Sequence, residues 1–223
     1  MFLPIRGIIN IIKERESGRV GQSINFKVER SLPEDYYWVN EPQLVEWNES
    51  QGLVMTTKPD TDFWQRTHYG FERDNGHCLF TKVKGDFEFT AEVSFEPLTQ
   101  YDQCGVMLRV DKDHWIKASV EYENESFSRL GSVVTNLGYS DWATIDISNE
   151  IKSMFYRISR RGHDVLIEYK APGADWKQMR VAHLHKVMET MEVGIYACSP
   201  RDRSFSCSVT QASIGSNHWE QEE

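Results

Sequence analysis

Residues 85–97, GDFEFTAEVSFEP, limit the possible folds of this chain more than any other segment. Successive side chains of a β-strand point to opposite faces, so an apolar–polar period of two predicts a strand with one buried and one solvated face. Such strands are typical of antiparallel sheets that pack on a core through one side. The residues expected to face the core are Phe87, Phe89, Ala91, Val93 and Phe95.

Further strand-like segments follow at regular spacing. Residues 103–110 and 114–121 are separated by a few polar residues, which predicts a hairpin. About a dozen strands with such spacing predict an all-β fold, a jelly-roll sandwich of two antiparallel sheets. The chain shows no internal repeat and no low-complexity linker.

We therefore expect a single β-sandwich domain over residues 23–215. Residues 1–22 are expected to form a short N-terminal segment, either an amphipathic helix or irregular structure, and residues 216–223 a C-terminal tail. The first residues, MFLPIRGIINIIKERE, are too short and too charged to span a membrane, and no small-residue cleavage site follows them.

Charge and cysteine usage exclude several function classes. The net charge is −9, whereas a non-specific nucleic-acid binder needs a basic face, so no nucleic-acid partner is expected. The four cysteines form no C-x-x-C pair and show no metal-finger spacing. A cytoplasmic protein with reduced thiols, no cofactor and no membrane partner is the expectation.

Five runs in the chain carry a family resemblance: TDFWQRTHYGFERDNGH, DQCGVMLRVDKDHWIKASVEYEN, RLGSVVTNLGYSDWAT, YRISRRGHD and VGIYACSP. Together they resemble the domain of unknown function 1349, also called the regulation-of-enolase protein family. The resemblance covers about residues 40–215 and implies a concanavalin A-like lectin/glucanase fold, in agreement with the strand pattern. The family's biochemical activity is not established, so the resemblance implies no catalytic residue.

The first candidate site is the run at residues 62–71, DFWQRTHYGF, expected to be one strand. Strand alternation places Trp64, Arg66 and His68 on one open face. A Trp ring can stack on the apolar face of a sugar while Arg and His donate to its hydroxyl groups. The alternative is a framework cluster in which Arg66 stacks on Trp64.

The second candidate site is formed by two neighbouring strands. Cys104, Val106 and Leu108 on one strand predict a core face, which leaves the intervening residues on the opposite face. In a curved sandwich that opposite face lines a concave groove; the alternative is a solvated sheet face with cross-strand charge pairs. The residues expected to bind a ligand there are Gln103, Arg109, Trp115, Lys117 and Glu121, with Tyr101 nearby as a further stacking ring.

The acidic run at residues 121–125 is a weak candidate for catalysis. Glu121, Glu123 and Glu125 share one face of an extended strand, with neighbours about 6.5–7 Å apart. Glycosidases need two carboxyl groups about 5–9.5 Å apart, so this spacing permits the chemistry. The intervening Tyr122 and Asn124 do not match the glucanase pattern, and acids solvated in a turn are the simpler interpretation. Histidines lack a third ligand at diagnostic spacing, so no metal site is expected.

The sequence thus favours a carbohydrate-binding or carbohydrate-related sandwich with its ligand on the concave sheet face. One alternative is a glycoside hydrolase or lyase that uses Glu121 with a second carboxylate. Another alternative is a regulatory protein that binds a metabolic enzyme.

Overall fold

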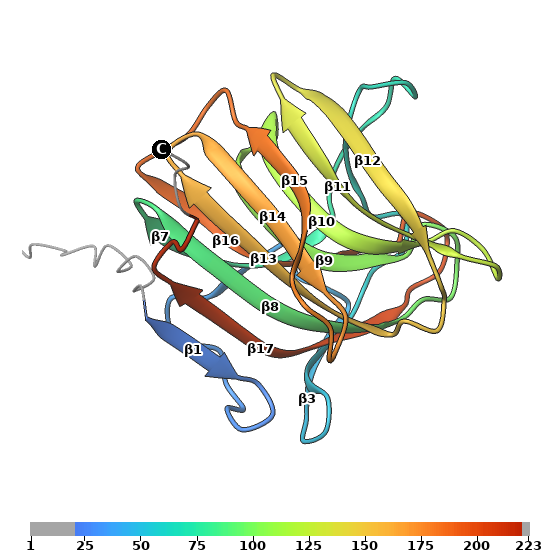
Figure 1. Ribbon diagram of the computed structural model, residues 1–223. Coiled ribbons are helices and arrows are strands. Elements are labelled where there is room, and N and C mark those ends of the chain that lie inside the picture. The colour runs from blue at the N-terminus through green and yellow to red at the C-terminus, as the bar shows by residue number, and fades with distance from the viewer. Residues whose placement is uncertain (1–20, 220–223) are drawn as a thin grey trace, which may run out of the picture.

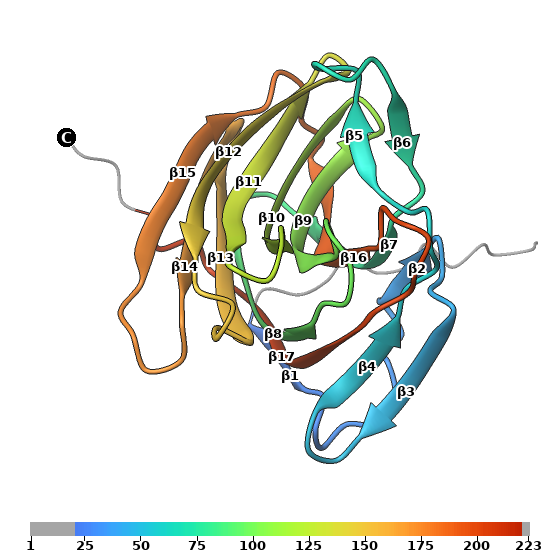
Figure 2. The ribbon, with the colours of Figure 1, turned by 90° about the vertical axis from the view of Figure 1, so that its right-hand side faces the viewer.

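The computed structural model describes residues 21–219, which form 17 β-strands and no helix. Two large antiparallel sheets pack face to face, and a third sheet of two strands lies on one side (Figure 1, Figure 2). The predicted all-β jelly-roll sandwich is therefore confirmed. The predicted strand number, about a dozen, is too low because the short strands before residue 77 lack a clear period of two.

The predicted N-terminal segment, residues 1–22, lies almost wholly outside the described residues. Its helical or irregular character stays a prediction, as do the domain limits. The part of the chain that the structure describes contains no helix that could cross a membrane.

The first large sheet has eight strands. Seven follow one another in the order β15-β14-β13-β8-β17-β4-β3, while β1 pairs with the C-terminal half of β17, next to the stretch that pairs with β4. Its strands are β1 (Gln22–Asn25), β3 (Leu44–Asn48), β4 (Gly52–Thr56), β8 (Phe87–Glu96), β13 (Ser153–Arg161), β14 (Asp164–Lys170), β15 (Lys177–His183) and β17 (Ser206–Gly215).

The second large sheet has seven strands in the order β12-β11-β10-β9-β16-β7-β2. The predicted hairpin between the two middle segments is present as β9 and β10. The strands of this sheet are β2 (Tyr37–Val39), β7 (His77–Lys84), β9 (Gln103–Asp111), β10 (His114–Tyr122), β11 (Ser128–Asn136), β12 (Tyr139–Ile147) and β16 (Thr190–Cys198).

The main core lies between these two sheets. The five residues of β8 that were expected to face the core are each at most 5% exposed. On the facing sheet, Cys104, Val106 and Leu108 of β9 join the same core, as do Ile116, Ala118 and Val120 of β10. The period of two thus assigns the faces of these strands correctly.

A second, smaller core lies on the outer face of the seven-stranded sheet, and we call it the outer cluster. It is covered by a hairpin made of β5 (Phe63–Gln65) and β6 (Glu72–Asp74). Because the sheet is covered on both faces here, most residues of β7, β9 and β16 are buried in succession rather than alternately. The buried residues of the outer cluster are Phe63, Trp64, Cys78, Phe80, Met107, Trp115, Val133, Tyr196 and Cys198.

The prediction of one continuous strand over residues 62–71 is wrong. Arg66 and His68 have positive φ angles of 58° and 63°, so the chain turns after β5 and returns as β6. Hydrogen bonds from Arg66 N to Phe71 O and from Gly70 N to Arg66 O close the turn. The two residues therefore do not share a strand face with Trp64.

Candidate functional site

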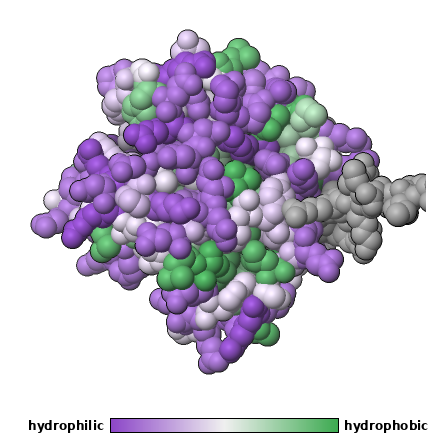
Figure 3. Space-filling view, turned by 180° about the vertical axis from the view of Figure 1, so that it is seen from behind, coloured by the Kyte–Doolittle hydropathy of each residue, from purple (hydrophilic) through white to green (hydrophobic). Residues whose placement is uncertain are grey.

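A pocket of about 500 Å³ lies on the outer face of the seven-stranded sheet, between the β5–β6 hairpin and the strands β11 and β12. Figure 2 shows the hairpin standing over this face. Figure 3 shows this side of the molecule from outside, where small hydrophobic areas interrupt a mainly hydrophilic surface. The pocket is lined by Asp60, Asp62, Trp64, Tyr69, Phe71, Arg73, Tyr101, Gln103, Lys117, Glu121, Val133, Trp142, Pro200 and Arg201.

Aromatic rings form one wall of the pocket. Trp64 lies at its centre, with ring centroids 5.7 Å from Tyr69 and 6.5 Å from Trp142, and Phe71 extends the row at 5.6 Å from Tyr69. Trp64 is 8% exposed and donates its Nε1–H to Thr67 O, which fixes the ring. Tyr69, Phe71 and Trp142 are 56%, 40% and 37% exposed, so their surfaces are open to a ligand.

Lys117 lies at the base of the pocket and is only 3% exposed. Its Nζ donates to Phe63 O at 2.9 Å, to Gln103 Oε1 at 2.8 Å and to the Asp62 carboxylate at 3.4 Å. These acceptors engage all three N–H donors of the ammonium group. Lys117 therefore ties the hairpin to the sheet and maintains the shape of the pocket.

Gln103 connects Lys117 to Glu121 through hydrogen bonds. Its Oε1 accepts hydrogen bonds from Lys117 and, at 3.1 Å, from Tyr196 Oη, which fixes the orientation of the amide. The Nε2 group consequently points toward two acceptors, Tyr101 O at 3.1 Å and Glu121 Oε2 at 3.0 Å. Within residues 21–219, the other oxygen of Glu121 has no hydrogen-bond partner.

Glu121 is the most perturbed acid of the pocket. The residue keeps some exposed surface, but burial of its carboxyl raises its pKa to about 8. The Lys117 ammonium opposes this rise, whereas the Asp62 carboxylate adds to it. Glu121 is therefore mostly protonated at neutral pH, and it can donate a hydrogen bond as well as accept one.

Five of the nine residues predicted to bind a ligand line this pocket, namely Trp64, Tyr101, Gln103, Lys117 and Glu121. The other four lie elsewhere. Two of them, Arg109 and Trp115, are on the predicted face but beneath the hairpin. Arg109 forms two hydrogen bonds of 2.8 Å with Asp74, and Trp115 is fully buried in the outer cluster.

Arg66 and His68 lie in the turn of the hairpin, outside the pocket. Arg66 pairs with Glu72 at 2.7 Å and lies over the Tyr139 ring at 5.7 Å. The His68 ring packs against Tyr69, with centroids 4.6 Å apart. Both residues thus stabilise the turn that places Tyr69 at the pocket.

Several pocket residues were not predicted from the sequence. Trp142 comes from edge strand β12, whereas Asp60, Pro200 and Arg201 come from loops that meet through a backbone hydrogen bond from Asp60 N to Arg201 O. No local pattern relates these segments. The tryptophan on β12, which is separated from the predicted polar strand β10 by β11, was the one available signal.

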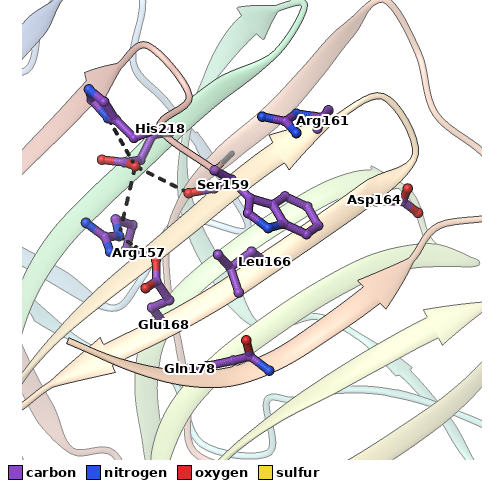
Figure 4. Close-up of a pocket in the computed structure, with 10 residues that line it drawn as sticks. Arg157, Ser159, Arg161, Asp164, Leu166, Glu168, Gln178 and His218 are labelled. Carbon is purple, nitrogen blue, oxygen red and sulfur yellow. Dashed lines mark hydrogen bonds and ion pairs between the residues drawn. The ribbon is translucent and has the colours of Figure 1, made fainter. Parts of the chain in front are cut away.

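A second hollow, of about 790 Å³, lies on the outer face of the eight-stranded sheet. The charged groups around Arg157 pair with one another (Figure 4), whereas Arg161, which also lines the hollow, lies over the Trp219 ring. Arg157 Nε lies 2.6 Å from Glu168 and 3.9 Å from Glu88, and His218 lies 3.5 Å from Glu88. The Arg157, Glu168 and Glu88 side chains are therefore engaged within the protein.

Histidines gather at one edge of the structure without forming a metal site. The His163 and His183 rings stack at 5.4 Å, and His185 lies 5.9 Å from His183. Among residues 21–219, no group of three or more His, Cys, Asp or Glu residues is arranged to hold a metal ion.

Comparison with known proteins identifies the family. The family described as "Protein of unknown function (DUF1349)" matches residues 38–217. The chain belongs to this family. It is 33% identical over 181 residues to "Regulation of enolase protein 1" of Saccharomyces cerevisiae, covering 79% of this chain and 87% of the relative.

Solved structures support the fold assignment. The crystal structure of a functionally unknown protein from Saccharomyces cerevisiae is 30% identical, with a TM-score of 0.74 over 83% of this chain and 98% of the other. A xylan β-1,4-xylosidase from Bacillus halodurans superposes with a TM-score of 0.67 at 12% identity. That match covers 92% of this chain but 41% of the xylosidase, and it shows a shared fold alone.

Proposed function

We propose that the pocket under the β5–β6 hairpin binds a carbohydrate. The observation that carries the proposal is the exposed aromatic wall beside a polar base. Sugar rings present an apolar face that stacks on Trp or Tyr, and their hydroxyl groups need nearby donors and acceptors. Trp142 and Tyr69 provide ring surface, and Glu121 provides a carboxyl oxygen without a protein partner in the described chain.

The fold adds support of a weaker kind. The xylosidase is a sugar-active enzyme by name and shares the sandwich. Fold similarity alone does not transfer function, so the proposal depends on the pocket.

The test is a screen of a glycan array and of soluble oligosaccharides with the parent protein and two variants. Trp142→Ala removes an exposed ring from the pocket, and we expect at least a tenfold loss of affinity. Trp176→Ala, which removes a ring stacked on Arg157 at 4.4 Å on the other sheet, is the matched control and should bind like the parent. Absence of sugar binding by the folded parent protein would refute the proposal.

A second candidate function is cleavage of the bound sugar. A carboxyl group that is protonated at neutral pH, as Glu121 is, meets the requirement for a general acid. Asp62 is the second carboxylate of the pocket base, although Lys117 and the Phe63 N–H already engage it. Incubating each sugar that binds with the parent protein and with Glu121→Gln tests this candidate: products formed by the parent alone would support it.

A third candidate is regulation of a metabolic enzyme, which rests on the name of the yeast relative. Calorimetric titration of this protein with purified enolase tests it directly. Heat of binding in the absence of any sugar binding would favour this candidate over the first.

A cytoplasmic location remains part of the proposal, supported by four buried and unpaired cysteines, which are typical of a reducing compartment.

A further inference from the structure

Two arginines at the mouth of the pocket have no acidic partner. Neither Arg73 nor Arg201 forms an ion pair with any carboxylate of residues 21–219. Most other arginines of this part of the chain do pair, for example Arg66 with Glu72 and Arg109 with Asp74. An unpaired guanidinium group at a pocket is available to a negatively charged ligand.

The protein holds both guanidinium groups in place with neutral groups. Arg73 Nη1 donates to Asp60 O at 3.0 Å. Arg201 Nη2 donates to Gln100 Oε1 at 2.8 Å, and its guanidinium group lies over the Tyr101 ring at 4.9 Å. Positioned in this way, each group keeps further N–H donors for another acceptor, because a guanidinium group carries five.

The segments that carry the two arginines adjoin at Asp60, which also lines the pocket. Asp60 accepts from the Arg73 side chain through its carbonyl, and its own N–H donates to the carbonyl of Arg201 at 2.9 Å. A single residue thus links the hairpin strand that carries Arg73 to the loop that carries Arg201.

The charge of the lining also favours an anion. Its cations are Arg73, Lys117 and Arg201, against the carboxylates of Asp60 and Asp62 and a largely neutral Glu121. The Asp62 carboxylate is already engaged by Lys117 and by the Phe63 N–H. The pocket is therefore net positive at neutral pH, in a chain whose net charge is −9.

We propose that the ligand is an anionic sugar, and that Arg73 and Arg201 bind its negatively charged group while the aromatic wall packs against its ring. This inference rests on the proposed function and narrows it to one ligand class. A uronic acid, which carries a carboxylate, and a sugar phosphate share the required chemistry. Both present oxygen atoms in a plane or cluster that a guanidinium group can bind with two hydrogen bonds.

The test compares matched ligands by calorimetry: glucose, glucuronate and glucose 6-phosphate, together with neutral oligosaccharides and oligouronates. We expect at least tenfold tighter binding of an acidic ligand than of its neutral counterpart, and weaker binding at higher salt. The double variant Arg73→Gln/Arg201→Gln should lose that preference. Arg161→Gln, on the eight-stranded sheet, is the control and should keep it.

The outcomes separate the two proposals. Equal or tighter binding of the neutral ligand would overturn this inference and leave the carbohydrate site intact. No binding of any sugar would overturn both. If inorganic phosphate or acetate bound as tightly as the acidic sugar, the site would recognise an anion and not a sugar. Tighter binding of glucuronate would identify the charged group as a carboxylate, and tighter binding of glucose 6-phosphate would identify it as a phosphate.

The pH dependence offers an independent readout. Groups that face Glu121 are Lys117 on its own strand, Asp62 before β5, Glu123 at the end of β10, Arg129 on β11, and the neutral Tyr101 and Tyr196. As the pH rises through about 8, Glu121 loses its proton and adds a negative charge to the pocket. Affinity for the anionic sugar should then fall, and the fall should be absent in Glu121→Gln. Unchanged affinity in the parent between pH 6.5 and 9 would contradict binding of the ligand's negatively charged group in the pocket that Glu121 lines.

Discussion

Charged side chains are arranged differently on the two outer faces of the sandwich. On the eight-stranded sheet, Arg157 and Glu168 lie 2.6 Å apart across neighbouring strands and neutralise one another. On the seven-stranded sheet, a hairpin covers part of the face, and beneath it Lys117 is buried and Glu121 is held largely neutral. The charged cluster around Arg157 in the larger hollow is thus paired across exposed strands, whereas the smaller pocket holds a buried cation and an acid that is largely neutral.

This difference shows what the hairpin adds to a common fold. A bare sheet face keeps its charges hydrated or paired, and such pairs contribute little to stability. Covering the face removes water, which shifts the pKa of an acid and makes the loss of one partner costly. The same covering creates a pocket with aromatic walls. The predictions below test whether the two faces differ as this argument requires.

The largest effect is expected at Lys117. Lys117→Met removes the buried ammonium group, which leaves the Asp62 carboxylate without its cation and removes a donor from Gln103 and the Phe63 carbonyl, so the free energy of unfolding should fall by about 3 kcal/mol or more. Arg157→Met removes a more exposed cation on the other face and should cost about 1 kcal/mol or less. Urea unfolding of both variants measures the contrast, and equal losses would contradict it.

The next largest effect on stability is expected at Glu121, where the substitution should raise the free energy of unfolding. Because its pKa is raised from 4.5 to about 8 on folding, the folded state binds more protons and parent stability falls as the pH rises between these values. Glu121→Gln does not titrate. It should match the parent near pH 5 and exceed its unfolding free energy by about 3 kcal/mol at pH 8.

The control for this pH effect lies on the other face. Glu168→Gln removes the partner of Arg157 and should lower the unfolding free energy by about 1 kcal/mol or less, without any gain at pH 8. Urea unfolding at pH 5 and pH 8 distinguishes the two variants. A gain at pH 8 for both, or for neither, would mean that the hairpin does not create a special environment.

A third effect concerns how closely the hairpin packs. A Cβ atom added at Gly76 would lie 2.4 Å from the Phe63 ring and 2.5 Å from Cys198 Sγ, both in the outer cluster. Gly76→Ala should therefore cost about 1–2 kcal/mol through overpacking. Gly215→Ala, at the end of β17, meets open space and should stay within about 0.5 kcal/mol of the parent. Thermal unfolding of the two variants compares them, and a neutral Gly76→Ala would show that the hairpin can shift.

The sequence predicted strand faces well where a strand has one buried side. The period of two in β8 identified its core residues, and the apolar side of β9 and β10 left Gln103, Lys117 and Glu121 on the correct outer face. It failed at residues 62–71 because the turn begins at Arg66 in left-handed backbone, a conformation that an arginine does not signal.

The rest of the pocket depends on register and topology, which no local pattern encodes. Arg109, Trp115 and Lys117 are on the same face and all lie under the hairpin, yet only Lys117 lines the pocket. Trp142 reaches the pocket because β12 pairs with β11 in one register, and Arg201 because its loop is bonded to Asp60. Such long-range pairings decide which polar residues meet, so a correct face assignment gave only part of the site.

The smallest effect on stability and on sugar affinity is expected at Trp219. This variant tests most directly which of the two outer faces binds the sugar. This ring lines the hollow on the eight-stranded sheet, where Arg161 lies over it at 5.8 Å. Trp219→Ala should leave the unfolding free energy within about 0.5 kcal/mol of the parent and any sugar affinity within about twofold. Calorimetry of Trp219→Ala beside Trp142→Ala decides between the faces. If Trp219→Ala lost binding while Trp142→Ala kept it, the sugar would bind in the hollow on the eight-stranded sheet. The polar groups of the pocket under the hairpin would then not identify the binding site.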